Sequence, residues 1–184
     1  AKLINHQTVR RAARNASAHY DIGNDLYERM LDKRLVYSCG YWRQADDLDA
    51  AQEAKLDLVC RKLRLRPGMR VLDIGCGWGE ALRHAAQRYG VSGVGVTISA
   101  EQARYARRLC EGLPVEIRLQ DYRDLDEPFD AALSIGMFEH VGVGHYREFF
   151  RKCRQLLADD GIAVLHSINR SDGPGATSSW IKKY

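Results

Sequence analysis

Residues 71–79 restrict the possible folds of this chain more than any other segment. They read VLDIGCGWG, an apolar run that ends in a turn with glycines at positions 75, 77 and 79. The apolar run predicts a buried strand, and glycine lets the following backbone turn tightly and approach a ligand closely. A strand, a glycine-rich turn and a helix form the ligand-binding unit of open α/β sheets. We therefore expect a ligand site at this turn.

Alternating strands and helices continue on both sides of the turn. Apolar runs predict strands at 70–74, 91–97, 115–120, 129–135 and 162–168. Helices are predicted at 80–89, from a Ser99 cap to about Cys110, and at 145–157. Apolar strands separated by helices of this length indicate a mostly parallel sheet covered on both faces. The predicted fold class is α/β, a doubly wound Rossmann-like sheet.

The chain divides near Pro67-Gly68, where a helical pattern gives way to this alternation. Residues 52–65 carry apolar side chains at helical spacing and predict one amphipathic helix. We expect residues 1–66 to form a helical segment that covers the ligand site, and residues 67–184 to form the Rossmann-like domain. The polar residues after Asn169 offer no strand to cover the fifth one. We therefore expect the sheet to be unfinished at Tyr184 and the protein to extend beyond both ends of this chain.

Charge and cysteine content exclude some classes of protein. A formal net charge of +4 is too small to indicate nucleic acid binding. Basic residues cluster at 10–14 and 61–66, where they fit either solvated helix faces or a surface that meets anionic lipid. The five cysteines form no CxxC pair, which favours reduced thiols in a cytoplasmic protein, and we assign no metal ligands. No apolar run approaches the roughly 18 residues of a membrane-spanning helix.

The spacing of the glycines favours one cofactor. G-x-G-x-G is one residue shorter than the G-x-G-x-x-G of dinucleotide-binding proteins, and it favours S-adenosylmethionine. Asp73 lies two residues before the first glycine, where it can support the turn or the ammonium group of the ligand. Many such proteins end their second strand in an acidic residue that binds the ribose, but this strand ends in Thr97-Ile98. The amide of Gln102 can supply those hydrogen bonds instead.

Six motifs in order resemble the cyclopropane-fatty-acyl-phospholipid synthases and their mycolic acid cyclopropane synthase relatives. They are HYDIGNDLYERML at 19–31, YSCGYW at 37–42, VLDIGCGWG at 71–79, GVTIS followed by EQ at 95–102, LQDYRDL at 119–125 and GMFEHVG at 136–142. The resemblance covers residues 19–184. It implies an S-adenosylmethionine-dependent methyltransferase fold. The implied reaction adds the methyl group to a cis double bond of a phospholipid acyl chain and closes a cyclopropane ring.

The resemblance also implies which residues form the site. The residues that match cofactor contacts are Tyr37, Ser38, Asp73, Gly75, Cys76, Gly77, Trp78, Gly79, Thr97, Gln102, Tyr122 and Arg123. Ligands of a bound bicarbonate, which serves the family as a base, match Cys39, Glu139 and His166, with Ile168 giving a backbone contact. The implied partner is unsaturated phospholipid at the membrane surface, reached by peripheral association, and a homodimer is allowed for.

Alternative interpretations remain open from the residues alone. Singly, Cys39, Glu139 and His166 fit a buried filler, a helix-start acid and a histidine with satisfied hydrogen bonds at a strand end. Trp78 fits either the pocket or the core, whereas we expect Trp42 to fill the core. The alternative functions are methyl transfer to a small molecule, formation of a methyl-branched lipid, and a cofactor- or lipid-binding domain without activity. We further expect the 184 residues alone to bind the cofactor weakly and to make no cyclopropane lipid.

Overall fold

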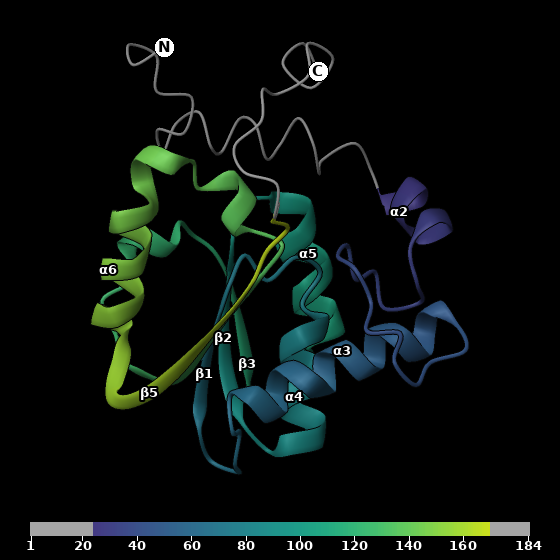
Figure 1. Cartoon of the computed structure of the whole chain (residues 1–184), viewed down its shortest axis with the longest axis horizontal. Coiled ribbons are helices and arrows are strands. Elements are labelled where there is room, and N and C mark those ends of the chain that lie inside the picture. Colours follow the sequence, from purple (N-terminus) through teal and green to yellow (C-terminus); the bar gives the residue numbers. More distant parts are fainter. Residues whose placement is uncertain (1–23, 170–184) are drawn as a thin grey trace.

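The computed structural model describes residues 24–169, and these residues form one parallel sheet flanked by helices (Figure 1). The strands are β1 (Arg70–Ile74), β2 (Ser92–Thr97), β3 (Val115–Leu119), β4 (Phe129–Ile135) and β5 (Leu157–His166). The helices are α2 (Asn24–Met30), α3 (Leu48–Lys62), α4 (Glu80–Tyr89), α5 (Ala100–Leu109) and α6 (Tyr146–Leu156). Three short 3-10 turns, η1 (Tyr122–Asp124), η2 (Phe138–His140) and η3 (Val143–His145), complete the described segment.

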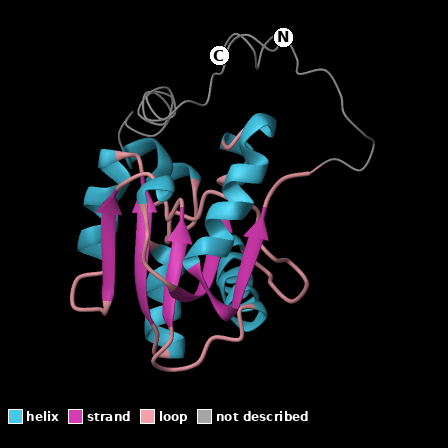
Figure 2. Ribbon diagram, turned by 90° about the vertical axis from the view of Figure 1, so that its left-hand side faces the viewer, coloured by secondary structure: helices cyan, strands magenta, loops and turns pink. Residues whose placement is uncertain are grey.

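The strand order is β3-β2-β1-β4-β5, and every neighbouring pair is parallel. The order reverses at β1, because the chain moves outward through β2 and β3 and then returns to the other side of β1 for β4. Ligands bind at such a reversal, beyond the carboxyl ends of the strands. Helices lie on both faces of the sheet (Figure 2), so the predicted doubly wound α/β class is confirmed.

Alternate residues of the central strands face two separate cores, as the period of two in a strand requires. Val71 of β1 packs in a cluster with residues of α3, α4 and α5, including Val59, Leu82 and Ala106. Leu72, the next residue, packs in the opposite cluster with Phe149 of α6. Because both faces are covered, the predicted strands could be near-continuous apolar runs rather than alternating ones.

The predicted bounds of β1, α4 and β4 agree with the structure, but those of α3 and β5 do not. Helix α3 begins at Leu48, four residues before the predicted start. The reason is a cap: the Asp47 side chain accepts a 2.7 Å hydrogen bond from the Ala50 N–H. Strand β5 begins at Leu157, not at 162. Its pairing with β4 is irregular between Phe129 and Ala131, and this irregularity absorbs the residues between Leu157 and Ile162.

Strand β5 lies at the edge of the described sheet and pairs with β4 alone. Its residues are half-buried or exposed along its whole length, whereas four of the five residues of β1 are buried. Within residues 24–169, no helix has the length and apolar character needed to cross a membrane. The predicted boundary at 66/67 stays a prediction, and α3 packs into the same core cluster as the sheet.

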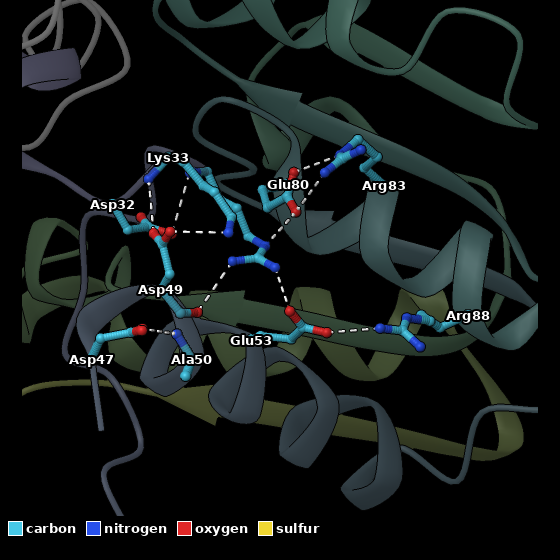
Figure 3. A network of polar contacts seen from close by, with 10 residues as sticks. Asp32, Lys33, Asp47, Asp49, Ala50, Glu53, Glu80, Arg83 and Arg88 are labelled. Carbon is cyan, nitrogen blue, oxygen red and sulfur yellow. Dashed lines mark hydrogen bonds and ion pairs between the residues drawn. The ribbon is translucent and has the colours of Figure 1, made fainter. Parts of the chain in front are cut away.

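A network of charged side chains joins the segment before α3 to α3 and α4 (Figure 3). Arg34 forms an ion pair with Glu53 of α3, and its Nε lies 3.4 Å from an oxygen of Glu80, the first residue of α4. Glu53 also lies 2.7 Å from Arg88, near the end of α4. The network holds residues 32–34 against the helix that follows the glycine turn.

Candidate active site

A pocket of about 260 Å³ lies where the strand order reverses, at the carboxyl ends of β1, β2 and β4. Eleven of the twelve predicted cofactor residues line it: Tyr37, Ser38, Asp73, Gly75, Cys76, Gly77, Trp78, Thr97, Gln102, Tyr122 and Arg123. The twelfth, Gly79, is outside the lining. A Cβ atom built on Gly79 would lie 2.9 Å from the Ala106 Cβ, so this glycine allows α4 and α5 to pack closely.

Backbone hydrogen bonds attach the glycine turn to strand β2. The N–H groups of Gly75 and Cys76 both donate 3.0 Å hydrogen bonds to the carbonyl of Val96. Gly75 has a φ of 81°, and a Cβ atom there would lie 2.5 Å from the Met137 side chain. Gly77 has a φ of 54° and no atom within 4 Å of its Cβ position, so its backbone borders open space. A ligand can therefore approach the backbone most closely at Gly77.

Asp73 is a buried acid in the wall of the pocket. Its carboxyl group is almost fully inaccessible to solvent, and burial raises its pKa to about 7. No described cation lies within ion-pair distance of it. A buried carboxyl group in this state gains a counter-charge when a ligand brings an ammonium group into the pocket.

Thr97 and Gln102 lie together at the end of β2 and the start of α5. The Thr97 hydroxyl donates a 2.9 Å hydrogen bond to Gln102 Oε1, and both side chains are buried at the pocket wall. The predicted Ser99 cap is present, since its hydroxyl accepts a hydrogen bond from the Gln102 N–H at 3.2 Å. Because Oε1 is already engaged, the Gln102 NH₂ is the group that can donate to a ligand hydroxyl.

Tyr122 and Arg123 form η1 directly after β3. Asp121 fixes them, because its carboxylate accepts hydrogen bonds from the Arg123 N–H at 3.0 Å and from the guanidinium at 2.6 and 2.9 Å. Burial raises the pKa of Tyr122 to about 12, so its phenol is neutral. The Tyr122 ring also packs edge-on against Phe149. The ring is thereby held rigid at the pocket wall.

Trp78 joins the glycine turn to the N-terminal part of the described chain. Its ring packs 4.8 Å from that of Tyr27, and its Nε1 donates a 3.0 Å hydrogen bond to Asn24 Oδ1. Trp78 is buried and also lines the pocket, so it has both of the roles considered from sequence. The expectation that Trp42 fills the core was wrong, because this side chain is 54% exposed. The preceding residue of the motif, Tyr41, donates a backbone hydrogen bond to the Ala51 carbonyl, so the backbone next to Trp42 is held against α3 while the Trp42 side chain is exposed.

The four predicted bicarbonate residues form a second group, outside the pocket lining but next to it. Cys39 Sγ lies 3.5 Å from His166 Nε2, although the two residues are 127 positions apart. Glu139 Oε1 accepts a 2.8 Å hydrogen bond from the Ile168 N–H. That N–H is therefore engaged within the protein, and the Ile168 side chain is 81% exposed.

The electrostatic state of His166 follows from its surroundings. Burial lowers its pKa, the positive charge of Lys55 lowers it further, and Glu139 raises it. His166 Nδ1 is buried and has no hydrogen-bond partner among residues 24–169. Cys39 and Glu139 are exposed, so the group has one buried side and one open side.

Several pocket residues were not predicted from the sequence. Asp121, His140 and His145 line the pocket, and Lys55 donates a 2.7 Å hydrogen bond to the pocket residue Ser38. Asp121 carried a usable signal, because it directly follows the third strand, where ligands bind in such folds. Lys55 carried none, since it is one of several polar residues in an amphipathic helix. Among residues 24–169, no three His, Cys, Asp or Glu side chains are grouped to hold a metal ion.

Comparisons with known proteins identify several proteins that are similar to this chain. A cyclopropane-fatty-acyl-phospholipid synthase of Escherichia coli is 52% identical over all 184 residues, which cover 48% of that protein. A mycolic acid cyclopropane synthase solved with SAH and CTAB superposes with a TM-score of 0.81 at 40% identity, covering 83% of this chain and 55% of that one. A coclaurine N-methyltransferase solved with SAH superposes with a TM-score of 0.75 at 33% identity, covering 82% of this chain and 45% of that one.

The chain thus spans about half the length of the curated relatives it matches. The family model for mycolic acid cyclopropane synthetase matches residues 7–184, nearly the whole chain. Both the sheet order and the pocket at its reversal occur within that match. The chain belongs to the mycolic acid cyclopropane synthetase family.

Proposed function

We propose that this chain binds S-adenosylmethionine in the pocket at the glycine turn. We propose further that the full-length protein transfers the methyl group to a cis double bond of a phospholipid acyl chain and closes a cyclopropane ring. One observation carries the proposal: Ser38 lines the pocket, and the adjacent Cys39 lies 3.5 Å from His166. A cofactor site and a second polar group are thus directly joined.

The pocket has the chemistry that this cofactor requires. The Asp73 carboxyl group suits the ammonium of its amino-acid portion, and the Gln102 NH₂ suits a ribose hydroxyl. Gly77 allows close approach of the backbone, and the rigid Tyr122 ring offers a face for adenine. The solved structures of two similar proteins with SAH support the same assignment.

The proposed reaction needs a base as well as a methyl donor. The alkene π electrons bond to the methyl carbon of the cofactor while the carbon–sulfur bond breaks and S-adenosylhomocysteine leaves. The resulting carbocation loses a proton from the transferred methyl group, and the electrons of that C–H bond close the ring. An alkene is a weak nucleophile, so the protein acts mainly by holding it against the methyl group and by stabilising the positive charge.

The group of Cys39, Glu139 and His166 fits a small oxyanion. The Cys39 thiol and a ring nitrogen of His166 can donate hydrogen bonds, and His166 Nδ1 lacks a partner in the described structure. Bicarbonate bound there would supply the base for the proton that ring closure releases. Cys39 and His166 would hold it, Glu139 would orient the backbone at Ile168, and the Ile168 N–H can reach the anion only if it leaves Glu139.

Access to a lipid chain is part of the proposal. Val143 is 80% exposed and Phe150 is 53% exposed on the η3–α6 segment. Exposed arginines accompany them on α6 at positions 147, 151 and 154. Apolar and basic side chains on one segment suit an anionic lipid surface. We propose peripheral membrane association of a cytoplasmic protein, and a homodimer that size-exclusion chromatography with light scattering would detect.

Methyl transfer to a small molecule is the second candidate, and the likeness to a coclaurine N-methyltransferase favours it. To separate the two, the full-length protein is incubated with methyl-labelled S-adenosylmethionine and either dioleoylphosphatidylglycerol vesicles or small amines. We expect label in the lipid, with cyclopropane protons in the NMR spectrum rather than those of a methyl branch. Vesicles of the saturated lipid are the control. Label in the amines and none in the unsaturated lipid would refute the proposal.

A further inference from the structure

Lys55 of α3 carries a buried positive charge. Its side chain is 3% exposed, and among residues 24–169 it is the only lysine or arginine that is buried. Its Nζ donates a 2.7 Å hydrogen bond to the Ser38 hydroxyl. No carboxylate of the described chain lies within ion-pair distance of it. A buried ammonium without a counter-charge is costly, so such groups are uncommon outside functional sites.

The surroundings of Lys55 show which groups its charge interacts with. Burial lowers its pKa to about 8, while negative charge at Cys39 and Asp32 would raise it. Asp32 is itself engaged, because its carboxylate accepts hydrogen bonds from the Val36 N–H at 2.8 Å and from the Arg34 N–H at 3.2 Å. The charge of Lys55 also reaches His166, whose pKa it helps to lower. Lys55 therefore faces the side of the structure where Cys39 and His166 meet.

The same region is held in place from α3. Gln52, one turn before Lys55, donates hydrogen bonds to the carbonyls of Val36 at 3.2 Å and Ser38 at 2.7 Å. Gly40 packs against α3, with its Cβ position 2.8 Å from the Ala51 Cβ. Lys55 adds the one charged contact in this set. The segment from Val36 to Gly40, which contains Cys39, is thus held against one face of α3.

We propose that Lys55 is a positioning residue for a small anion: its ammonium holds Ser38 and supplies the positive charge that draws the anion to Cys39 and His166. The inference rests on the proposed function, in which that anion is bicarbonate. Lys55 acts through Ser38 and through its electric field, without being assigned a contact with the lipid. A neutral side chain of similar length would keep most of the packing and lose the attraction.

The test measures bicarbonate binding in the full-length protein. Sodium bicarbonate is titrated calorimetrically, in carbon dioxide-free buffer, into protein saturated with S-adenosylhomocysteine. Lys55→Met should weaken bicarbonate binding at least tenfold, and Lys55→Arg, which keeps the charge, less than threefold. Lys33→Met changes an exposed lysine paired with Asp49 and should have no effect.

Rates of cyclopropane formation on dioleoylphosphatidylglycerol vesicles then show whether the reaction depends on the bound bicarbonate. The bicarbonate concentration for half-maximal rate should rise at least tenfold in Lys55→Met, with the maximal rate much less affected. Equal bicarbonate affinity in folded Lys55→Met and wild type would overturn the proposal. If Lys55→Met does not fold, Lys55→Gln replaces it under the same criterion. If the wild-type protein makes no cyclopropane lipid, the proposed function is refuted. If the wild-type rate depends on bicarbonate and the Lys55 variant has the same bicarbonate dependence, only the role of Lys55 is refuted.

Discussion

The glycine turn and the Cys39–His166 group are neighbouring sites built in different ways. The turn and its partners come from consecutive βα units, and strand, turn and helix position them locally. Cys39, Glu139 and His166 come from three segments separated by 100 and 27 residues, and they meet only because α3 and the ends of β4 and β5 pack near one another. A locally built site is tolerant of distant change, while one assembled from separate segments depends on each of them.

Glu139→Gln has the largest expected effect and tests whether the Cys39–His166 group has a role separate from that of the glycine turn. If the Cys39–His166 group serves only the loss of the proton and the closure of the ring, ring formation in the full-length protein should fall roughly 100-fold or more. Such a loss is typical when groups that assist proton transfer are disabled. Cofactor affinity should stay within twofold, because Glu139 lies outside the pocket lining. Labelled-lipid turnover and calorimetry with S-adenosylhomocysteine measure the two quantities. Unchanged turnover would remove Glu139 from the mechanism.

Gly75→Ala tests the local site. A side chain there needs a φ of 81° and overlaps Met137, so we expect a loss of about 3 kcal/mol in the free energy of unfolding. Cofactor binding should weaken at least tenfold. Gly112→Ala is the matched control, because Gly112 has a φ of 78° and nothing within 4 Å of its Cβ position. It should lose about 1 kcal/mol in urea unfolding. Equal losses in the two variants would show that the Met137 contact is unimportant.

Asp73 gives the local site a pH dependence. Its pKa of about 7 means that raising the pH from 6 to 8 converts it largely to the carboxylate, so cofactor affinity should rise roughly tenfold. Asp73→Asn should bind weakly with little pH dependence in calorimetry. The stability of the unliganded protein responds in the opposite direction. The raised pKa contributes stability that is fully present below pH of about 4 and is lost as the pH rises through about 7.

A pH profile in Asp73→Asn that still rises tenfold would assign the titration to another group. His166 lies outside the pocket lining, and burial together with the positive charge of Lys55 lowers its pKa from the ordinary value.

The smallest expected effect concerns the contact between the glycine turn and α2. Trp78→Phe removes the hydrogen bond to Asn24, which should lower the free energy of unfolding by about 1 kcal/mol. Combined with Asn24→Ala in a double-mutant cycle, it should give a coupling energy of roughly 0.5 to 1.5 kcal/mol in urea unfolding. Additive losses in the cycle would mean that Trp78 acts through the packing of its ring and not through this hydrogen bond.

The sequence predicted the elements of the fold correctly where neighbouring residues determine the secondary structure. Strand β1 and helix α4 were placed correctly, because a buried apolar run and a glycine-bounded helix depend on neighbouring residues. The start of β5 was misplaced, because residues between Leu157 and Ile162 pair irregularly with a strand almost thirty residues earlier. Trp42 was misjudged for a similar reason: an aromatic side chain is apolar wherever it lies, and only packing decides its exposure.

What the sequence by itself determined is the local part of this protein: the strand, the three glycines, the Ser99 cap and Asp73 at the strand end. These follow from backbone conformation and periodicity within a few residues. Only the tertiary structure decided that Lys55 is buried beside Ser38 and that Cys39 Sγ lies 3.5 Å from His166 Nε2, a pair that the family resemblance had assigned to one site. The burial and electrostatics of these groups depend on contacts between segments far apart in the chain, and no local pattern records such contacts.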